Sequence, residues 1–285
     1  MPFAEWIEGS RYRVWFSARD ARGRSQVGWA IVDIDDPGEV LELADAPSLG
    51  PGRLGCFDDS GAMLSWIARD PATDERLWYY IGWNLGVTVP FRNAIGLARE
   101  SAGEVERVFE GPVVDRSRDE PHFTASCCVL PGDRVWRMYY LACTGWDLVE
   151  GRPRHRYHLR YAESGDGVEW QRDGRVAIDF EDEREYAISR PSVLASEGGY
   201  AMWFSARGTA YRIYRADSAD GIEWRRRPGT SLGPGTASWE DEMVCYPHVV
   251  IHDDRRLLFY NGNGYGATGF GVAEQPLSAP PGNAS

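Results

Sequence analysis

The chain has 285 residues, of which 43% are hydrophobic and 26% charged, and its formal net charge is −12. Nucleic acid and anionic membranes are bound through basic patches, so this charge argues against both as partners. The 12 Trp, 14 Tyr and 32 Gly favour an all-β protein, because aromatic residues suit strands and glycine suits tight turns.

Targeting and redox features are absent from the sequence pattern. The first residues lack the basic and apolar segments of a signal peptide, and no apolar run approaches the roughly 18 residues of a membrane span. The five cysteines form no CxxC pair, and their odd number argues against a disulfide framework. We therefore expect a soluble cytoplasmic protein without a cofactor.

Five aromatic-rich segments recur along the chain. Their second aromatic residues are separated by 64, 60, 64 and 56 residues and lie at Phe16, Tyr80, Tyr140, Phe204 and Tyr260. Each is followed by a second strand-like segment that ends in alanine, at Ala30, Ala98, Ala162, Ala216 and Ala273. Short strands repeated at this length are typical of a β-propeller. The sequence predicts one five-bladed β-propeller over residues 1–274 and a flexible tail over residues 275–285.

Acidic residues precede the first strand of several units. Counting back from each aromatic marker aligns Asp59, His122, Tyr186 and Glu242, and Asp58, Glu120 and Asp241 lie one or two positions earlier. First strands line the channel of a propeller, so these loops are expected to meet at one rim. Fourteen residues before Phe16 is Pro2, so the first unit is expected to supply no matching acid.

Other polar and aromatic residues are candidates for binding a substrate. Arg190, which precedes a proline, is either a clamp on a sugar hydroxyl or carboxylate, or an internal counter-ion for the rim acids. Trp83 either stacks on a sugar or packs in the core. The remaining candidates flank the expected pocket: Asn84, Arg92, Asn93, Tyr246 and His248. No HxH or HExxH spacing is present, so no metal site is predicted.

Several of these motifs resemble bacterial glucosyl-hydrolase-like propeller proteins, distant relatives of glycoside hydrolase families 43 and 32. The similar segments are residues 54–59 (LGCFDD), 79–84 (YYIGWN), 92–98 (RNAIGLA), 186–191 (YAISRP) and 260–266 (YNGNGYG). The resemblance covers nearly the whole chain and is more specific for the fold than for an activity, since fold does not determine function.

The resemblance implies an axial pocket with three acidic groups, because glycoside cleavage needs one carboxyl as acid and another as base or nucleophile. The matching positions are Asp59 or Asp58 as base or nucleophile, Glu242 or Asp241 as general acid, and Glu120 as the orienting carboxylate. Family 43 enzymes usually take their base from the first blade, where this chain offers none.

Three functions follow from this sequence. The first is an enzyme that cleaves or modifies a small glycoside or sugar-containing intermediate with these carboxylates. The second is a sugar-binding propeller without catalysis. The third is a propeller that carries out another acid–base reaction, such as a cyclisation or elimination, in a biosynthetic pathway. All three have a small sugar-containing molecule as the expected partner.

Overall fold

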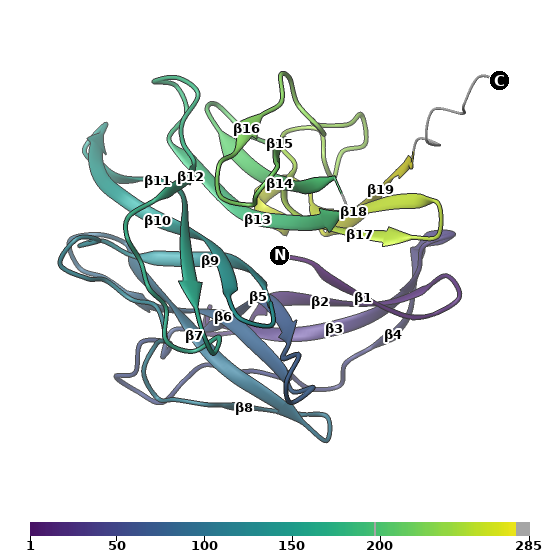
Figure 1. The fold of residues 1–285 in the computed structure, drawn as a ribbon, viewed down its shortest axis with the longest axis horizontal. Helices are drawn as coiled ribbons and strands as arrows, with labels where there is room; N and C mark the ends of the chain where they lie inside the picture. Colours follow the sequence, from purple (N-terminus) through teal and green to yellow (C-terminus); the bar gives the residue numbers. More distant parts are fainter. Residues whose placement is uncertain (197, 278–285) are drawn as a thin grey trace.

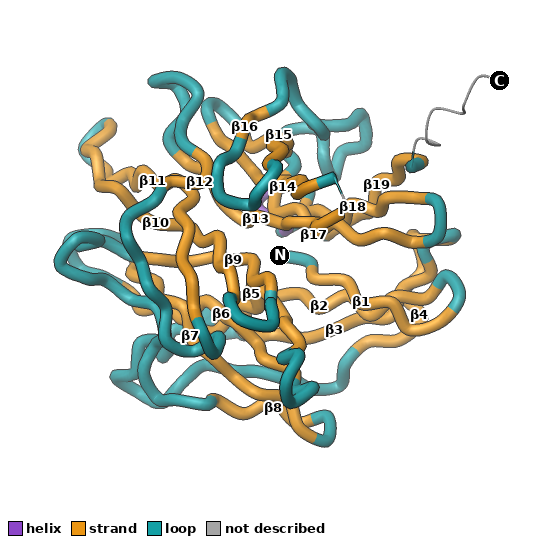
Figure 2. Tube along the Cα trace, viewed as in Figure 1, coloured by secondary structure: helices purple, strands orange, loops and turns teal. Residues whose placement is uncertain are grey.

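The computed structural model describes residues 1–196 and 198–277, whose regular secondary structure is almost entirely antiparallel β-strand (Figure 1, Figure 2). The first two sheets each have four strands paired in chain order. One contains β1 (Phe3–Glu8), β2 (Arg11–Arg19), β3 (Ser25–Asp33) and β4 (Asp36–Leu43). The other contains β5 (Ala62–Arg69), β6 (Arg76–Leu85), β7 (Phe91–Ser101) and β8 (Glu104–Arg107).

The middle of the chain forms one eight-stranded sheet from two meanders. The first meander contains β9 (Thr124–Leu130), β10 (Trp136–Val149), β11 (Arg152–Ser164) and β12 (Val176–Ile178). The second contains β13 (Ala187–Ser196), β14 (Gly199–Arg207), β15 (Tyr211–Ser218) and β16 (Arg225–Arg226). A parallel pairing of Tyr157 with Ala187 joins the two meanders.

The last sheet has three strands, β17 (Cys245–His252), β18 (Arg255–Asn261) and β19 (Phe270–Pro276). A short helical turn, α1 (Asn263–Gly266), separates β18 from β19. The predicted tail starts at 275, whereas β19 continues to Pro276, and residues 278–285 of that tail lie outside the described residues. No helix within the described part of the chain is long and apolar enough to cross a membrane.

The first strands of the meanders lie around the middle of the molecule, close to the N-terminus (Figure 1). Contacts between them run in a cycle: β1 with β5, β5 with β9, β9 with β13, β13 with β17, and β17 with β1. β9 is buried along nearly all of its length, as expected for a strand covered on both faces, whereas the outer strand β4 is exposed throughout. The core is therefore continuous from one sheet to the next.

The predicted all-β class is confirmed. The five aromatic markers lie on the second strand of each meander, namely β2, β6, β10, β14 and β18, and the five alanines lie on the third. The second strands carry several of the largest fully buried aromatic side chains, among them Trp78, Tyr79 and Tyr139. The aromatic repeat in the sequence thus reflects one packing position used repeatedly.

Candidate functional site

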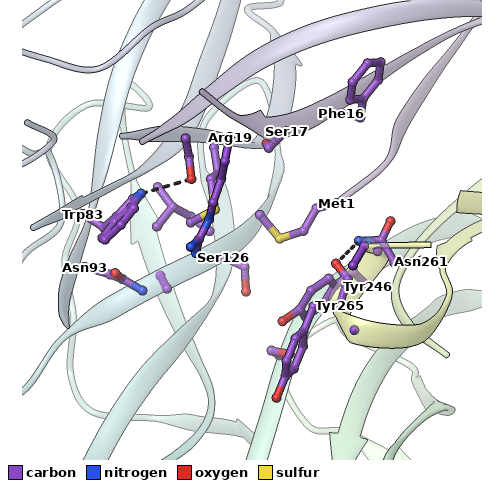
Figure 3. A pocket seen from close by; sticks show the side chains of 18 of the residues that line it. Met1, Phe16, Ser17, Arg19, Trp83, Asn93, Ser126, Tyr246, Asn261 and Tyr265 are labelled. Atoms are coloured by element: carbon purple, nitrogen blue, oxygen red, sulfur yellow. Dashed lines mark hydrogen bonds between the residues drawn. The ribbon is translucent and has the colours of Figure 1, made fainter. Parts of the chain in front are cut away.

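A cavity of about 1140 Å³ opens near the inner ends of the meanders. Every meander contributes to its lining, through residues such as Phe16, Trp83, Ser126, Ser189 and Tyr246. Figure 3 shows Arg19 beside Trp83 on one wall, with Tyr246 and Tyr265 facing them across the open space. The cavity is large enough for a ligand of oligosaccharide size.

The charge of the cavity lining is unexpected for a chain with 43 acidic and 31 basic residues. Among the described residues that line it, none is Asp or Glu. The charged side chains are those of Arg19 and Arg207, and the other polar groups are Ser, Asn, Tyr and His side chains. The axial pocket with three acidic groups that the resemblance implies is therefore not what lines this cavity.

Three of the predicted binding residues do line the cavity: Trp83, Asn93 and Tyr246. Trp83 donates a hydrogen bond from Nε1 to Ser25 Oγ at 3.2 Å and is only 9% exposed, so it is partly a packing residue. Tyr246 has φ 60°, and its backbone N–H donates to Ser205 Oγ at 2.7 Å. This left-handed backbone is unusual for tyrosine, and it directs a side chain of the inner strand to the cavity.

Asn84 and Arg92 line a second, smaller cavity of about 450 Å³. Asn93 borders both cavities, so the two lie next to each other. The only acidic residue among the described residues that line the second cavity is Asp115. Exposed Leu85 at the end of β6 and exposed Val87 in the loop between β6 and β7 form part of its wall.

Glu120, predicted as the orienting carboxylate, does not line the cavity. It is 7% exposed and accepts hydrogen bonds from Tyr140 Oη at 2.6 Å and from Arg160 at 2.8 Å. Arg172 forms a second ion pair with its other oxygen. Three donors therefore hold this carboxylate in a network with β10 and β11, away from the cavity lining.

Asp58 is likewise held inside the protein and does not contact the cavity. It is 1% exposed, and one oxygen accepts from Arg107 Nε at 2.7 Å and from Tyr80 Oη at 3.1 Å. A Cβ at Gly96 would lie 2.3 Å from the Tyr80 ring, so glycine at this position lets the ring lie flat over β7. Asp58, predicted to bind substrate, thus anchors its loop to β6 and β8 through Tyr80 and Arg107.

Asp59, the predicted base or nucleophile, is half-buried and does not line the large cavity. Its oxygens accept from Asn84 Nδ2 at 2.7 Å, from Ser60 Oγ at 3.1 Å and from the Gly55 backbone N–H at 3.1 Å. Burial opposes ionisation of Asp59, but these hydrogen bonds outweigh it and lower its pKa. Asp59 is thus a stable carboxylate that orders its own loop.

The predicted general acid, Glu242, is exposed, as is Asp241. Asn263 fixes this loop, because its Nδ2 donates to Asp241 at 2.8 Å and its Oδ1 accepts from the Glu242 backbone N–H at 2.9 Å. Neither carboxylate lines the cavity. His122 and Tyr186 are half-buried and also lie outside the lining, although Tyr186 packs against Arg207 with 5.5 Å between Cζ and the ring centroid.

Arg190, predicted as a clamp on a sugar or as an internal counter-ion, is fully buried and does not line the cavity. Its guanidinium donates to the carbonyl oxygens of Ser65 and, at 2.9 Å, of Pro2, and its backbone N–H donates to Ser126 Oγ at 3.0 Å. Burial lowers its pKa to about 10, so it remains charged at neutral pH. Arg190 therefore joins β13 to the inner strands of other meanders and contacts neither sugar nor carboxylate.

His248, predicted to bind substrate, is buried and does not line the cavity. Its Nδ1 accepts from the Ala4 backbone N–H at 2.9 Å, and its ring packs on Phe3 with 4.2 Å between centroids. Burial, with a further contribution from the positive charge of Arg190, lowers its pKa well below the usual value. His248 is a neutral residue at the junction of the first and last sheets.

The recurrence of acidic residues has a structural cause. In three meanders a carboxylate from the loop before the first strand accepts a hydrogen bond from the hydroxyl of the tyrosine marker, in the pairs Asp58–Tyr80, Glu120–Tyr140 and Glu240–Tyr260. In the fourth meander the marker is Phe204, and Glu185 pairs instead with Arg226, which lies over that ring. The pattern repeats because these four meanders each anchor the loop before their first strand through a carboxylate, three of them by a tyrosine and one by an arginine.

The sequence reasoning missed Arg19, Arg207, His155 and Tyr265, all of which line the cavity. A signal for the two arginines exists, because residues 15–19 and 203–207 both read Trp-Phe-Ser-Ala-Arg. Each arginine is the last residue of the second strand of its meander and lies three residues after the aromatic marker. Trp83 lies three residues after the marker of β6. Aligning the residues that follow each aromatic marker, instead of those that precede it, identifies residues that line the cavity.

His155 provides a test of the cationic character of this cavity. Burial, together with the smaller effect of the charges of Arg207 and Arg154, lowers its pKa to about 4. The unfolded chain therefore binds a proton that the folded protein excludes between pH 6.5 and about 4, so stability falls as pH decreases through this range. We expect the free energy of unfolding, measured in urea, to fall less between pH 7 and pH 4.5 for His155→Phe than for the unsubstituted protein. Equal decreases in the two proteins would contradict this assignment.

No cluster of three or more His, Cys, Asp or Glu that could hold a metal ion occurs within residues 1–196 and 198–277. The five cysteines are unpaired, and four of them are buried. Burial raises the pKa of Cys127 to about 12, so this thiol is a small apolar core residue. The chemistry of the site thus rests on arginine, aromatic and neutral polar side chains.

Comparison with known proteins places the chain in a family. No family model matches it. It is 43% identical, over 277 residues, to the uncharacterized proteins Rv1502 and MT1551 from two strains of Mycobacterium tuberculosis, covering 96% of this chain and 91% of theirs.

Solved structures of glycoside hydrolases are similar in fold. A glycosyl hydrolase from Bacteroides ovatus has a TM-score of 0.67 at 15% identity, covering 98% of this chain and 84% of that one. A structure from work on the GH130 family of mannoside phosphorylases and glycoside hydrolases has a TM-score of 0.70 at 16% identity, covering 98% and 84%. A thermostable family-43 glycoside hydrolase has 0.60 at 15%, covering 96% and 88%. The chain therefore belongs to the family of the two mycobacterial proteins and has a fold shared with glycoside hydrolases, as its resemblance to glucosyl-hydrolase-like propellers implied.

Proposed function

We propose that residues 1–274 form a single five-bladed propeller that binds a saccharide in its large cavity. The cyclic contacts between β1, β5, β9, β13 and β17 support the blade count, since each first strand touches the next. The similarity to glycoside hydrolases supports a carbohydrate-active role. The cavity combines aromatic faces with neutral hydrogen-bonding groups, which is the lining that sugars need.

The observation that carries this proposal is the absence of Asp and Glu among the described residues that line the cavity. Hydrolysis of a glycoside uses two carboxyl groups about 5 to 9.5 Å apart, one on each side of the scissile bond. Glu120 and Asp58 are already neutralised by arginine, and Glu242 lies on the exposed loop. Binding without carboxylate-based hydrolysis is therefore the function we favour.

Tyr265 is the best probe of sugar binding. It is 47% exposed, lines the cavity and has φ 61°, which places an aromatic side chain at a backbone position that glycine usually takes. We expect Tyr265→Ala to weaken binding of a saccharide identified on a glycan array by about tenfold or more, as measured by calorimetry. Tyr265→Phe keeps the aromatic face and is expected to retain most of the affinity.

A carboxylate-based enzyme is the second candidate, because the shared fold belongs to glycoside hydrolases and Asp59 is an ionised carboxylate beside the second cavity. The same saccharides should be incubated with the protein and the products separated by chromatography. Binding without turnover supports the proposed function. If the protein turns a saccharide over, and a folded Asp59→Asn or Glu242→Gln variant does not, the binding function is replaced by the enzyme assignment.

A further inference from the structure

The two arginines of the cavity differ from most arginines around them. Arg76, Arg107, Arg160, Arg172 and Arg226 form ion pairs with carboxylates. Within the described part of the chain, Arg19 and Arg207 form none, although the protein has an excess of acidic residues. Arg19 is exposed and Arg207 is half-buried, and a cavity lined by these two unpaired positive charges is suited to an anionic ligand.

Aromatic side chains hold these two arginines in place. Arg19 Cζ lies 5.4 Å from the Trp83 ring centroid. Arg207 Cζ lies 5.5 Å from both Tyr186 and Tyr211 and 5.7 Å from Tyr265. A guanidinium that contacts rings through its face keeps its in-plane N–H groups available for an anion, and this planar fork fits carboxylate and phosphate oxygens.

Arg207 has an unused donor. It is half-buried, one terminal nitrogen donates to the Tyr265 hydroxyl, and its Nε is buried without a partner in the structure. An N–H group without an acceptor is unfavourable inside a protein, so the site is stabilised when a ligand supplies the acceptor. Because Arg207 bonds Tyr265, it belongs to the wall that faces Arg19 (Figure 3).

The positive charge of Arg207 acts on another residue that lines the cavity. His155 lines the same space, and the positive charge of Arg207 contributes to its lowered pKa. No acidic side chain among the described lining residues offsets this charge. An anionic group entering the cavity therefore meets positive charge from two walls and a row of neutral donors.

We propose that the ligand of the cavity is an anionic saccharide, one that carries a phosphate, sulfate or carboxylate group, and that Arg207 binds this group. Arg19, on the facing wall, draws the negatively charged ligand into the cavity. This inference rests on the proposed saccharide-binding function and specifies the class of sugar. It also explains why an arginine ends the Trp-Phe-Ser-Ala-Arg segment in two different meanders.

Three probes separate the chemical sources of the charge: inorganic phosphate, glucuronate and glucose. Binding is measured by calorimetry, and the arginine Nε–H resonances are followed by NMR during each titration. We expect saturable binding of phosphate or glucuronate, with glucose at least tenfold weaker. Phosphate binding indicates a phosphorylated or sulfated sugar, and glucuronate binding indicates a carboxylated one.

The variants test which residue binds the anion. Arg207→Gln is expected to weaken binding of the anion at least tenfold. Arg207→Lys is expected to weaken it less, because lysine keeps the charge but not the planar fork. Arg19→Gln is expected to weaken it severalfold and to reduce its dependence on salt. Arg22→Gln removes one exposed positive charge in the adjacent turn, outside the cavity, and is expected to have no effect.

The outcomes separate this inference from the proposed function. Unchanged affinity for the anion in Arg207→Gln, or no binding of either anion, overturns the inference. If neutral saccharides then bind in a manner that depends on Tyr265, saccharide binding still stands. Binding of phosphate that depends on Arg207, without binding of any saccharide on the array, supports the anion site and contradicts the proposed function.

Discussion

Replacing Arg190 with alanine is expected to lower the free energy of unfolding by about 4 kcal/mol or more. The change leaves the buried carbonyl oxygens of Ser65 and Pro2 without a donor, at about 1 to 3 kcal/mol each, and empties the volume of a large side chain. Chemical unfolding followed by tryptophan fluorescence measures the effect. Arg92→Ala, at an exposed position, is the control and is expected to change stability by less than about 0.5 kcal/mol.

The backbone at position 190 provides a second comparison. Arg190 has φ 52°, a conformation that costs an L-residue about 1 to 2 kcal/mol and glycine almost nothing. Arg190→Gly is therefore expected to be at least as stable as Arg190→Ala, the reverse of the usual order in a strand. A small effect of both substitutions would show that the guanidinium does not hold the inner strands together.

Replacing Glu120 with glutamine is expected to lower the free energy of unfolding by about 2 to 4 kcal/mol, because it leaves Arg160 and Arg172 without their shared counter-charge. Both arginine side chains keep 18–20% exposure, so the cost is below that of a fully buried pair. We expect saccharide binding by the folded Glu120→Gln protein to be unchanged, since Glu120 does not line the cavity. Chemical unfolding and calorimetry on the same sample measure the two quantities.

A double-mutant cycle isolates this network. Arg172→Gln alone is expected to lower the free energy of unfolding. The double variant with Glu120→Gln is expected to lose less stability than the sum of the two single variants, because either change alone already breaks the pair. Normal stability of Glu120→Gln together with loss of binding or turnover would instead assign Glu120 a direct role in the site, as the sequence comparison proposed.

The architecture could be predicted because it depends on a repeated pattern. Five aromatic markers followed by five alanines correspond to one packing position in each meander, and this regularity is visible without a structure. The extent of β19 could not be read in the same way, since Gln275 and Pro276 carry no strand signal but pair with Arg256 and Arg255. The composition of a segment does not show that its residues pair with residues 19 or more positions away in the sequence.

The site was harder to predict because a one-dimensional pattern does not give the direction of a side chain. Asp58 and Glu120 recur at matching positions, as expected for a functional ring, yet they point into ion pairs that anchor their own loops. The cavity is lined instead by the ends of second strands, where Arg19 and Trp83 lie side by side. Trp83, Asn93 and Tyr246 were found because they are close to those ends.

The junction between the first and last sheets has a consequence for how the chain folds. The Ala4 backbone and His248 are hydrogen-bonded although 244 residues separate them, and β1 contacts both β5 and β17. The loop-closure entropy of this contact opposes its formation until the intervening meanders are in place. Ring closure is therefore a late, non-local event that can take place only after nearly the whole chain has left the ribosome, and folding is expected to be slow for a protein of this size.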